Sequence, residues 1–273
     1  MTLYAGIDIG SCTTKAVVIN QGGNIVGSHV HRSGIDYHKA AMEALDIALG
    51  GTAWNDIPIV STGYGRHSID FASEAKTEIA CDARAGFTYV PRALTLVDIG
   101  GQDNKVIKLD DRGRRIDFKL NRKCAAGTGA FIEEIAAKLA IPLNLLDGMA
   151  RKAEKRVRIG SYCTVFAATE ILSLIRAGVS SEDLIRGVFA SVVDRVMEMI
   201  PLADLVLLCG GVVEHNPIIM DIIRARISGE VIVAPHPQLT GAYGAALFAC
   251  ESAGRHGLPR GKARGVGSRP QLD

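Results

Sequence analysis

The sequence predicts an α/β protein with two similar lobes that face one another across a cleft. The main observation is an internal repeat: GIDIGSCTTKAVVINQGGNIVGSHV is matched, at an offset of 90 residues, by VDIGGQDNKVIKLDDRGRRIDFKL. Each copy has the pattern of strand, polar glycine turn, strand, tight turn and strand. Helical patterns follow each copy, and a repeated strand unit with covering helices indicates two lobes of one design.

The two copies agree at their most informative positions. They share an aspartate and an isoleucine at the end of the first strand, the glycine after it, a lysine in the second strand and a turn glycine. The matched pairs are Asp8 and Asp98, Ile9 and Ile99, Gly10 and Gly100, Lys15 and Lys105, and Gly23 and Gly113. Agreement in both turns and both strands favours duplication over chance.

The other elements follow from their periodicity. After the first copy we expect a helix over 36–49 and a strand over 57–61. After the second we expect a helix over 129–140 and helical structure over 163–200 that breaks near Gly178. Towards the end, DLVLLCGGVVEHNP predicts a buried strand, a Gly-Gly turn and a helix, and EVIVAPHPQLTGAYGAALFAC predicts a strand and a small-residue helix.

We expect the boundary between the lobes near residues 91–94. Residues 1–92 then form the N-terminal lobe and residues 93–239 the C-terminal lobe, while the helix over 240–253 returns to pack on the first lobe. The remaining segment, 254–273, is rich in glycine and arginine, a composition typical of a disordered basic tail.

Composition excludes several classes of function. The chain has 273 residues, 48% of them hydrophobic, and a net charge of +2. Five of its 31 basic residues but only one of its 29 acidic residues lie in the tail, so the body is near neutral and lacks the basic face that nucleic acid requires. With no secretory signal pattern and no apolar run of roughly 18 residues, we expect a cytoplasmic protein without membrane contact.

The six cysteines form no CxxC pair, which argues against a disulfide framework and against a self-contained zinc site. Cys124 differs from the others because it precedes a glycine-rich turn into a helix. A thiol there could be a nucleophile, a metal ligand or a packed side chain. Cys209 and Cys250 lie in apolar or small-residue contexts and are expected in the core, and Cys81 is expected to be structural.

The duplicated turns predict a nucleotide site. A glycine turn with small polar residues exposes backbone N–H groups and hydroxyls to phosphate, as expected for Gly10, Ser11, Thr13 and Thr14. Asp8 and Asp98 could hold hydrated Mg²⁺ between two opposed turns. The alternative is that both aspartates only cap their turns.

A third turn, Gly210–Gly211, lacks side chains and would let adenine or ribose lie against the backbone. Its alternative role is close packing of a helix on a strand. The sequence contains neither GxxxxGK[ST] nor GxGxxG, so a P-loop and a Rossmann fingerprint are excluded. ATP bound between two lobes is the better interpretation.

These motifs resemble two known groups of proteins. The order GIDIGS…K, DIGGQD…K, CGGV resembles the phosphate-1, phosphate-2 and adenosine motifs of the actin, Hsp70 and sugar-kinase superfamily, which implies ribonuclease-H-like lobes. More narrowly, STGYGR, DIGGQDNKVI, NRKCAAGTGAF, SYCTVFAATE and GGVVEHNP resemble ATP-dependent activators of 2-hydroxyacyl-CoA dehydratases and ATP-binding subunits of benzoyl-CoA reductases, the BadF/BadG/BcrA/BcrD type. The similarity covers about residues 3–250.

The resemblance implies that two identical or paralogous chains share one [4Fe–4S] cluster. The matching cysteines here are Cys124 and Cys163, and four thiolates on a two-fold axis satisfy the usual ligand count. Arg122 and Lys123 would favour the Cys124 thiolate and balance cluster charge. Gly127 and Gly129 would let the helix that begins near Ala130 point its N-terminal dipole at the cluster.

The resemblance also implies an ATP-driven electron donor. Reduced ferredoxin or flavodoxin would load one electron, and ATP hydrolysis would drive its transfer to a 2-hydroxyacyl-CoA dehydratase or a benzoyl-CoA reductase. The motifs fit either partner.

Specific roles follow for the site residues. Asp8 and Asp98 would organise Mg²⁺, and Gln102 would orient the attacking water. The residues expected to contact or border the nucleotide are Gly10, Ser11, Cys12, Thr13, Thr14, Lys15, Gly100, Gly101, Gly210, Gly211 and Asn216. Cys12 stands where the family more often has a hydroxyl or small residue, and Lys15 could instead be a solvated strand lysine.

Two other classes of function are compatible with the nucleotide motifs. One is a small-molecule kinase of the same superfamily, for which the segments between the lobes look too short. The other is an interaction protein that uses ATP to switch shape. Neither needs Cys124 or Cys163, so iron content separates them from the electron donor.

Overall fold

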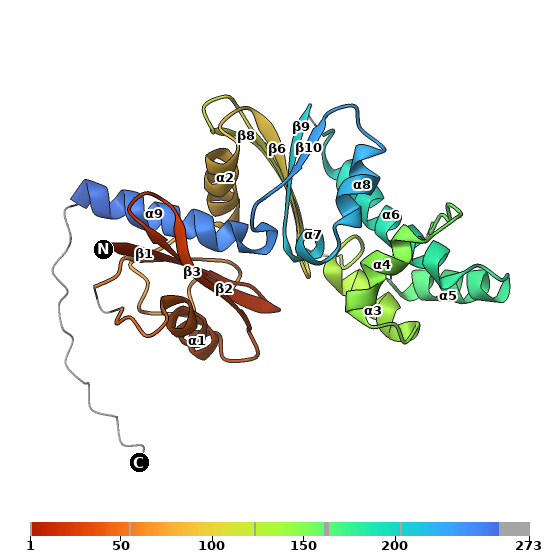
Figure 1. The fold of residues 1–273 in the computed structure, drawn as a ribbon, viewed down its shortest axis with the longest axis horizontal. Coiled ribbons are helices and arrows are strands. Elements are labelled where there is room, and N and C mark those ends of the chain that lie inside the picture. Colours follow the sequence, from red (N-terminus) through yellow and green to blue (C-terminus); the bar gives the residue numbers. More distant parts are fainter. Residues whose placement is uncertain (1, 55, 123, 161–163, 203, 257–273) are drawn as a thin grey trace, which may run out of the picture.

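The computed structural model describes residues 2–54, 56–122, 124–160, 164–202 and 204–256 (Figure 1). It contains two five-stranded sheets, ordered β3-β2-β1-β4-β5 and β10-β9-β6-β7-β8. In each sheet a central strand pairs antiparallel with the next strand in sequence and parallel with a later one. The predicted fold class, two α/β lobes of related topology, is confirmed.

The first sheet begins with the predicted three-stranded meander. Its strands are β1 (Leu3–Ile9), β2 (Thr13–Asn20), β3 (Ile25–Arg32), β4 (Ile59–Thr62) and β5 (Glu74–Ala75). Helix α1 (Tyr37–Leu49) is capped by the Asp36 side chain, which accepts from the Lys39 N–H, and it ends at Gly50 in the left-handed conformation. Its alanine-rich face packs on β2 and β3, where a Cβ at Gly27 would collide with the Ala48 carbonyl.

The second sheet repeats this plan. Its strands are β6 (Leu94–Ile99), β7 (Asn104–Leu109), β8 (Arg115–Asn121), β9 (Leu205–Cys209) and β10 (Glu230–Val233). β6 and β9 are buried along their whole length, as expected for parallel strands that are covered on both faces. The largest hydrophobic core lies between this sheet and the helices beside it.

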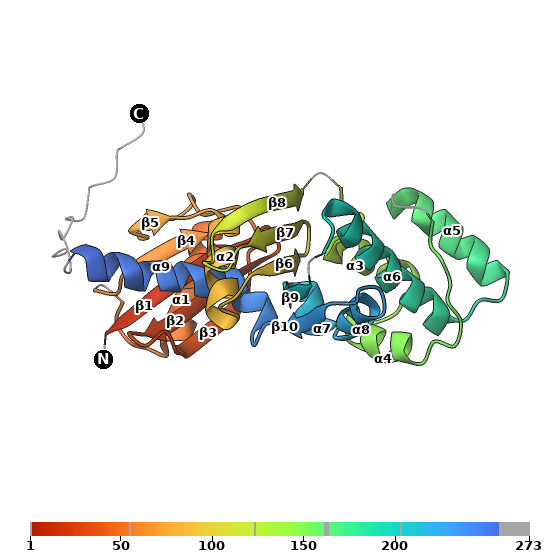
Figure 2. The same ribbon diagram turned by 90° about the horizontal axis from the view of Figure 1, so that it is seen from above.

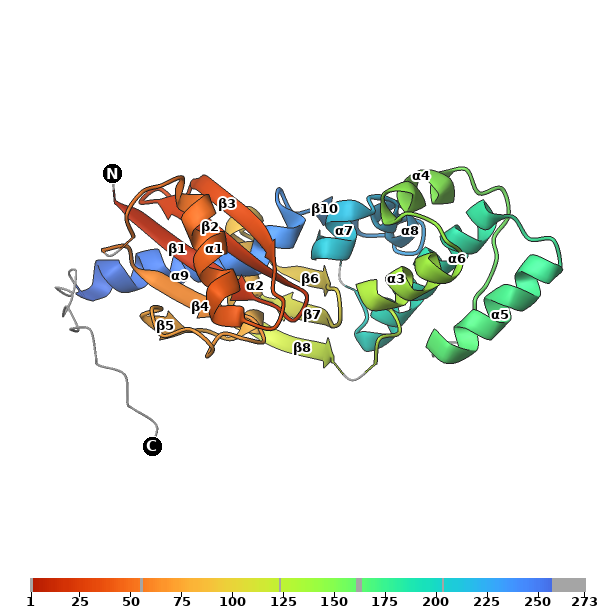
Figure 3. The ribbon, with the colours of Figure 1, turned by 90° about the horizontal axis from the view of Figure 1, so that it is seen from below.

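Most helices lie at the end of the molecule away from the first lobe (Figures 2 and 3). They are α3 (Gly129–Lys138), the 3₁₀ turn η1 (Leu143–Leu145), α4 (Leu146–Arg151), α5 (Thr164–Arg176), α6 (Ser181–Met199), α7 (Gly211–His215) and α8 (Ile218–Arg224). The predicted break near Gly178 separates α5 from α6, and Gly178 adopts a positive φ of 79°. Ser180 caps α6 by accepting from the Asp183 N–H.

Two helices cross between the sheets. α2 (Glu78–Tyr89) buries Ile79 and Ala83 against the second sheet. α9 (Thr240–His256), which follows the 3₁₀ turn η2 (Pro237–Leu239), packs on β1 of the first sheet, where Gly6 lets the helix backbone approach. The helices touch at Gly244, since a Cβ there would lie 1.9 Å from the Cys81 carbonyl oxygen, and the rings of Tyr89 and Tyr243 stack at 5.1 Å. The two lobes are therefore joined through α2 and α9.

Among the described residues, no helix combines the length and the apolar character needed to cross a bilayer.

Candidate nucleotide site

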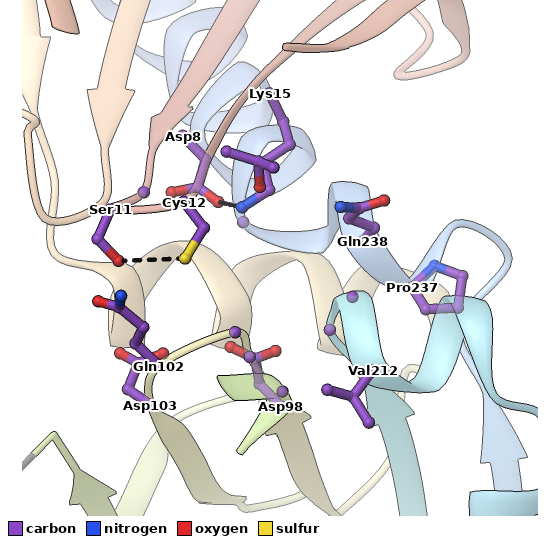
Figure 4. Close-up of a pocket in the computed structure, with 18 of the residues that line it drawn as sticks. Asp8, Ser11, Cys12, Lys15, Asp98, Gln102, Asp103, Val212, Pro237 and Gln238 are labelled. Atoms are coloured by element: carbon purple, nitrogen blue, oxygen red, sulfur yellow. Dashed lines mark hydrogen bonds and ion pairs between the residues drawn. The ribbon is translucent and has the colours of Figure 1, made fainter. Parts of the chain in front are cut away.

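A cavity of about 940 Å³ separates the two sheets. Both duplicated turns line it, and so do the start of α7 and the segment around η2 (Figure 4). Figure 4 shows Asp8 and Lys15 on one side of this space, with Asp98, Gln102 and Asp103 on the other. The cavity therefore lies where the sequence places the cleft.

The first turn joins β1 to β2 and is closed by a hydrogen bond from the Gly10 N–H to the Thr13 carbonyl, 3.1 Å. Asp8 stands beside Lys15 in the strand register, and their side chains form an ion pair of 3.2 Å. Lys15 is only 15% exposed and lines the cavity, so it is not a solvated strand lysine. Ser11 and Cys12 at the tip of the turn are exposed to the cleft.

The second turn has the same geometry. The Gly100 N–H donates to the Asp103 carbonyl at 2.9 Å, and Asp98 faces Lys105 in the strand register. The Asp98 Oδ2 and Lys105 Nζ atoms are 2.5 Å apart. The Asp, Gly and Lys residues duplicated in the sequence therefore form the same arrangement in both lobes. In each, the aspartate at the end of one strand pairs with a lysine of the next strand.

The two turns approach one another closely. A Cβ at Gly101 would be 3.4 Å from the Cys12 sulfur, so the tip of the first turn lies against the backbone of the second. Gln102 is exposed and lines the cavity.

The third turn completes the cavity beside η2. Gly210 follows β9 with a φ of 97°, and its N–H donates to the Pro237 carbonyl at 2.9 Å. Gly211 opens α7, where an added Cβ would be 3.4 Å from the Gln238 side chain. Asn216 is buried at the end of α7 and its side chain donates to the Val212 carbonyl, 3.0 Å. The two glycines expose backbone on this wall, which suits a flat ligand, and Pro237 and Gln238 line the cavity beside them.

Of the expected nucleotide contacts, only Thr14 does not line the cavity. Its side chain is fully buried, and its hydroxyl lies 2.9 Å from Ser33 Oγ, which in turn donates to the Gly10 carbonyl. The expectation of direct contact was wrong because successive residues of a strand point to opposite faces, and Thr14 follows the cleft-facing Thr13. Thr14 stabilises the first turn on the side away from the cavity, through Ser33.

Several charged residues of the cavity were missed by sequence reasoning. Lys105 was noted only as the repeat partner of Lys15, yet it lies between three carboxylates: Asp98, Glu78 at 3.2 Å and Asp103 at 3.4 Å. Burial alone would lower the pKa of Lys105, but these acids and Asp82 raise it well above its usual range. Lys105 is therefore a fixed positive charge beneath the second turn.

Asp82 is a second missed residue, and it lies on α2 at the floor of the cavity. It is 3% exposed, and its Oδ2 atom has no hydrogen-bond partner. A Cβ at Gly241 would be 3.4 Å from both the Asp82 and the Asp8 carboxylate, so the two acids face the same point. Burial raises the pKa of Asp82 well above its usual value, and the neighbouring carboxylates add to the rise against the opposing effect of Lys105.

Cys124 lies in the turn before α3, half-buried and without a disulfide. The Asn121 side chain donates to its carbonyl at 3.0 Å. Cys163, the other expected metal ligand, lies outside the described residues, as does Lys123. The structure thus gives a position for one of the two expected cluster ligands.

One expectation about this segment was wrong. The N-terminus of α3 is directed at the second turn, because the N–H groups of Gly129 and Ala130 donate to the Gly100 and Gly101 carbonyls at 2.9 and 2.7 Å. These N–H groups are therefore not available to a ligand at Cys124. The Arg122 guanidinium pairs with Glu78 at 2.6 Å, and its effect on the Cys124 thiolate stays a prediction.

The remaining cysteines fit the expected structural roles. Cys81 and Cys209 are fully buried, and burial raises the pKa of both thiols. Cys250 is half-buried at the edge of the core on α9, where its thiol pKa is also raised by burial.

Two α/β lobes with paired phosphate-type turns across one cavity define a two-lobed nucleotide-binding protein. The chain belongs to the BadF/BadG/BcrA/BcrD ATPase family, whose model matches residues 5–249. It is 41% identical to an activator of lactoyl-CoA dehydratase from Anaerotignum propionicum, over 91% of this chain and 97% of the relative.

Two solved structures are similar over nearly the whole chain. One is component A of the (R)-2-hydroxyglutaryl-CoA dehydratase of Acidaminococcus fermentans, with a TM-score of 0.87, 32% identity, and coverage of 93% of this chain and all of the other. The second is the activator of the 2-hydroxyisocaproyl-CoA dehydratase from Clostridium difficile with bound ADPNP, with a TM-score of 0.86, 36% identity, and coverage of 96% and 100%. The predicted family is confirmed.

Proposed function

We propose that this chain is an ATP-hydrolysing electron-transfer protein that drives the one-electron reduction of a 2-hydroxyacyl-CoA dehydratase. The observation that carries the proposal is the position of the Cys124 segment, which leads directly into a helix bonded to the second phosphate turn. A nucleotide in the cleft would contact the second turn, and a redox group at Cys124 would lie beside the helix whose first N–H groups bond that turn. The similarity to dehydratase activators supports the choice of partner over a benzoyl-CoA reductase.

Mg²⁺·ATP would bind between the two turns. Carboxylate oxygens and water are the preferred ligands of Mg²⁺, and the Asp8 and Asp98 carboxylates face one cavity from opposite lobes. Backbone N–H groups of both turns would contact the phosphates. Gly210, Gly211 and Asn216 would border the adenosine, and Gln102 would orient the attacking water.

A [4Fe–4S] cluster would be shared between two chains. Such a cluster usually takes four thiolates, whereas the described residues contain no group of three or more His, Cys, Asp or Glu that could hold a metal ion. The half-buried, unbridged Cys124 fits a ligand contributed to a shared site, with Cys163 as the second ligand from each chain. When bound, the cluster would supply storage for one electron at a time, loaded from reduced ferredoxin or flavodoxin.

The surface of α5 supports the second copy as partner. This helix begins one residue after Cys163, and it exposes Phe166, Leu172 and Ile175, the first of them by 68%. Large apolar side chains gathered on one exposed helix are typical of a contact surface. A second chain packed on these side chains would remove their apolar surface from water.

Nucleotide would couple to electron transfer only if its states bind two conformations with different affinity. The fold offers a physical basis for this, because the cavity is lined from both lobes and the lobes are joined through α2 and α9. Lobe closure around Mg²⁺·ATP would move the second turn relative to the first.

The proposal is tested on full-length protein purified without oxygen. We expect about four iron atoms per dimer, ATP hydrolysis, and ATP-dependent reduction of a 2-hydroxyacyl-CoA dehydratase. Cys124→Ala should lose the iron and the reduction, while Cys250→Ala, a half-buried thiol on α9, should retain both. Iron-free wild-type protein, or a Cys124→Ala variant that still reduces the dehydratase, would overturn the proposal.

A further inference from the structure

A chain of ion pairs leads from the second phosphate turn to the segment that carries Cys124. Asp98 Oδ2 lies 2.5 Å from Lys105 Nζ, which lies 3.2 Å from Glu78 Oε2. The other oxygen of Glu78 lies 2.6 Å from Arg122 Nη2. Arg122 is two positions before Cys124, so three consecutive ion pairs connect the turn to this segment.

A second acid strengthens the connection between the two cations. Asp103 lies 3.4 Å from Lys105 Nζ through Oδ1, and 3.5 Å from Arg122 Nε through Oδ2. Lys105 and Arg122 thus share both Glu78 and Asp103. A movement of Lys105 changes the negative charge that is available to Arg122.

Burial makes the inner part of this chain sensitive to added charge. The side chains of Lys105, Asp98 and Glu78 are 7%, 12% and 12% exposed, whereas Arg122 is 43% exposed. Charges interact more strongly where water is excluded. A cation that arrives at Asp98 therefore acts strongly on Lys105, and Arg122 is the most exposed member of the chain of ion pairs.

Hydrogen bonds from the Asn121 side chain hold the backbone at Cys124. The Asn121 side chain donates to the carbonyls of Cys124 and Ala126, at 3.0 and 3.4 Å. These bonds hold Cys124 and Ala126 to Asn121, the last residue of β8 and the neighbour of Arg122 in the chain.

We propose that Arg122 is a positioning residue that couples occupancy of the phosphate site to the position of Cys124. The inference rests on the proposed function only in that Mg²⁺·nucleotide binds beside Asp98. A cation there competes with Lys105 for the Asp98 carboxylate, and Lys105 then turns its charge towards Glu78 and Asp103. Arg122 loses part of its attraction to both acids, and its hold on the position of Cys124 weakens.

The structure also contains a connection that does not involve Arg122. The N–H groups of Gly129 and Ala130 bond the carbonyls of the second turn, which joins α3 to the same site. A substitution of Arg122 breaks the chain of ion pairs but leaves these backbone bonds in place. It therefore distinguishes coupling through Arg122 from coupling through α3.

The test measures the alkylation rate of the Cys124 thiol by iodoacetamide in full-length, reduced, iron-free protein. The labelled peptide is quantified by mass spectrometry, which distinguishes Cys124 from the other cysteines. In wild type we expect saturating Mg²⁺·ADP to raise the rate about threefold to fivefold, the range expected for loss of a partly exposed ion pair. Arg122→Gln should react fast with and without nucleotide, and Arg122→Lys should restore part of the response.

The matched control is Arg92→Gln, which removes a half-exposed arginine that pairs with Glu230 at 2.7 Å and does not line the cavity. It should respond like wild type. The proposal is overturned if the wild-type rate is unchanged by Mg²⁺·ADP, or if Arg122→Gln keeps the wild-type response, in which case the α3 bonds carry the coupling.

Iron content and calorimetric binding of Mg²⁺·ADP are measured separately. Protein that binds nucleotide but no iron contradicts the proposed function, while the alkylation rates still decide the role of Arg122.

Discussion

Gly210 lies directly against Asp98: a Cβ at Gly210 would be 2.3 Å from Asp98 Oδ1. The first lobe repeats this relationship, since a Cβ at Gly63 would be 2.5 Å from Asp8 Oδ1. Both glycines follow the strand that runs parallel to the aspartate's own strand, and both have positive φ angles, 97° and 92°. Each lobe therefore positions its aspartate with a glycine of the neighbouring strand.

We expect Gly210→Ala to lower kcat/KM for ATP about tenfold or more. The methyl group would displace the Asp98 carboxylate, and the positive φ adds backbone strain of about 1–3 kcal/mol. Steady-state ATPase assays on the purified variant check this. Gly148→Ala serves as control because a Cβ at that α4 position meets no atom within 4 Å. Equal activity of both variants would show that the Asp98 position does not matter for hydrolysis.

Lys105 and Lys15 should differ in their contribution to stability. Removing one partner of a buried ion pair leaves an uncompensated charge, which costs about 3–5 kcal/mol. We expect Lys105→Met to lower the free energy of unfolding by about 3 kcal/mol or more, because Asp98, Glu78 and Asp103 lose their common partner. Lys15→Met leaves only Asp8 without its partner, at a more exposed site, and should lower the free energy of unfolding by about 1 kcal/mol. Urea denaturation without nucleotide measures both, and the reverse order would contradict this account.

Asp82 gives a prediction about pH. A carboxyl group whose pKa is higher in the folded than in the unfolded protein binds more protons when folded, so its contribution to stability is lost as pH rises from about 3.9 towards the folded pKa. Asp82→Asn removes this loss. The variant should therefore be more stable than wild type at pH 8, by roughly 1–3 kcal/mol, and the gain should disappear below about pH 4.

Thermal unfolding at a series of pH values from 4 to 8 measures the effect of Asp82→Asn. Asp70→Asn is an exposed control. His38 and the backbone lower the pKa of Asp70, so the contribution of Asp70 to stability is lost as pH falls, and not as pH rises. A gain for Asp82→Asn that grows towards low pH would contradict the raised pKa.

The sequence could predict that both aspartates and the three turns lie together because these features are local or duplicated, and all of them line one cavity. It did not reveal Glu78 and Asp82, since no helix was predicted over Glu78–Tyr89, the segment that forms α2. Only the tertiary fold shows that this helix crosses beneath the cavity and packs on the second sheet. Thr14 could have been excluded by strand alternation, whereas the direction of the α3 N-terminus depends on a contact between distant segments.

Cys12 should be the nucleotide-protected thiol of the cleft. It is exposed at the tip of the first turn and faces Gly101, whereas Cys81 and Cys209 are fully buried. We expect a maleimide to label Cys12 rapidly and to inhibit ATP hydrolysis. ATP present at 10 times its Kd should slow the labelling about tenfold, because the bound nucleotide covers the turn.

Cys12→Ser provides the control for this experiment. Serine keeps the size and polarity of a small turn residue, so the variant should hydrolyse ATP within about threefold of wild type, a change of less than 1 kcal/mol in transition-state stabilisation. It should also resist inhibition by the maleimide. Inhibition that persists in Cys12→Ser would assign the sensitive thiol elsewhere, with Cys124 as the first residue to examine because it is half-buried and lies beside the α3 that borders the same cavity.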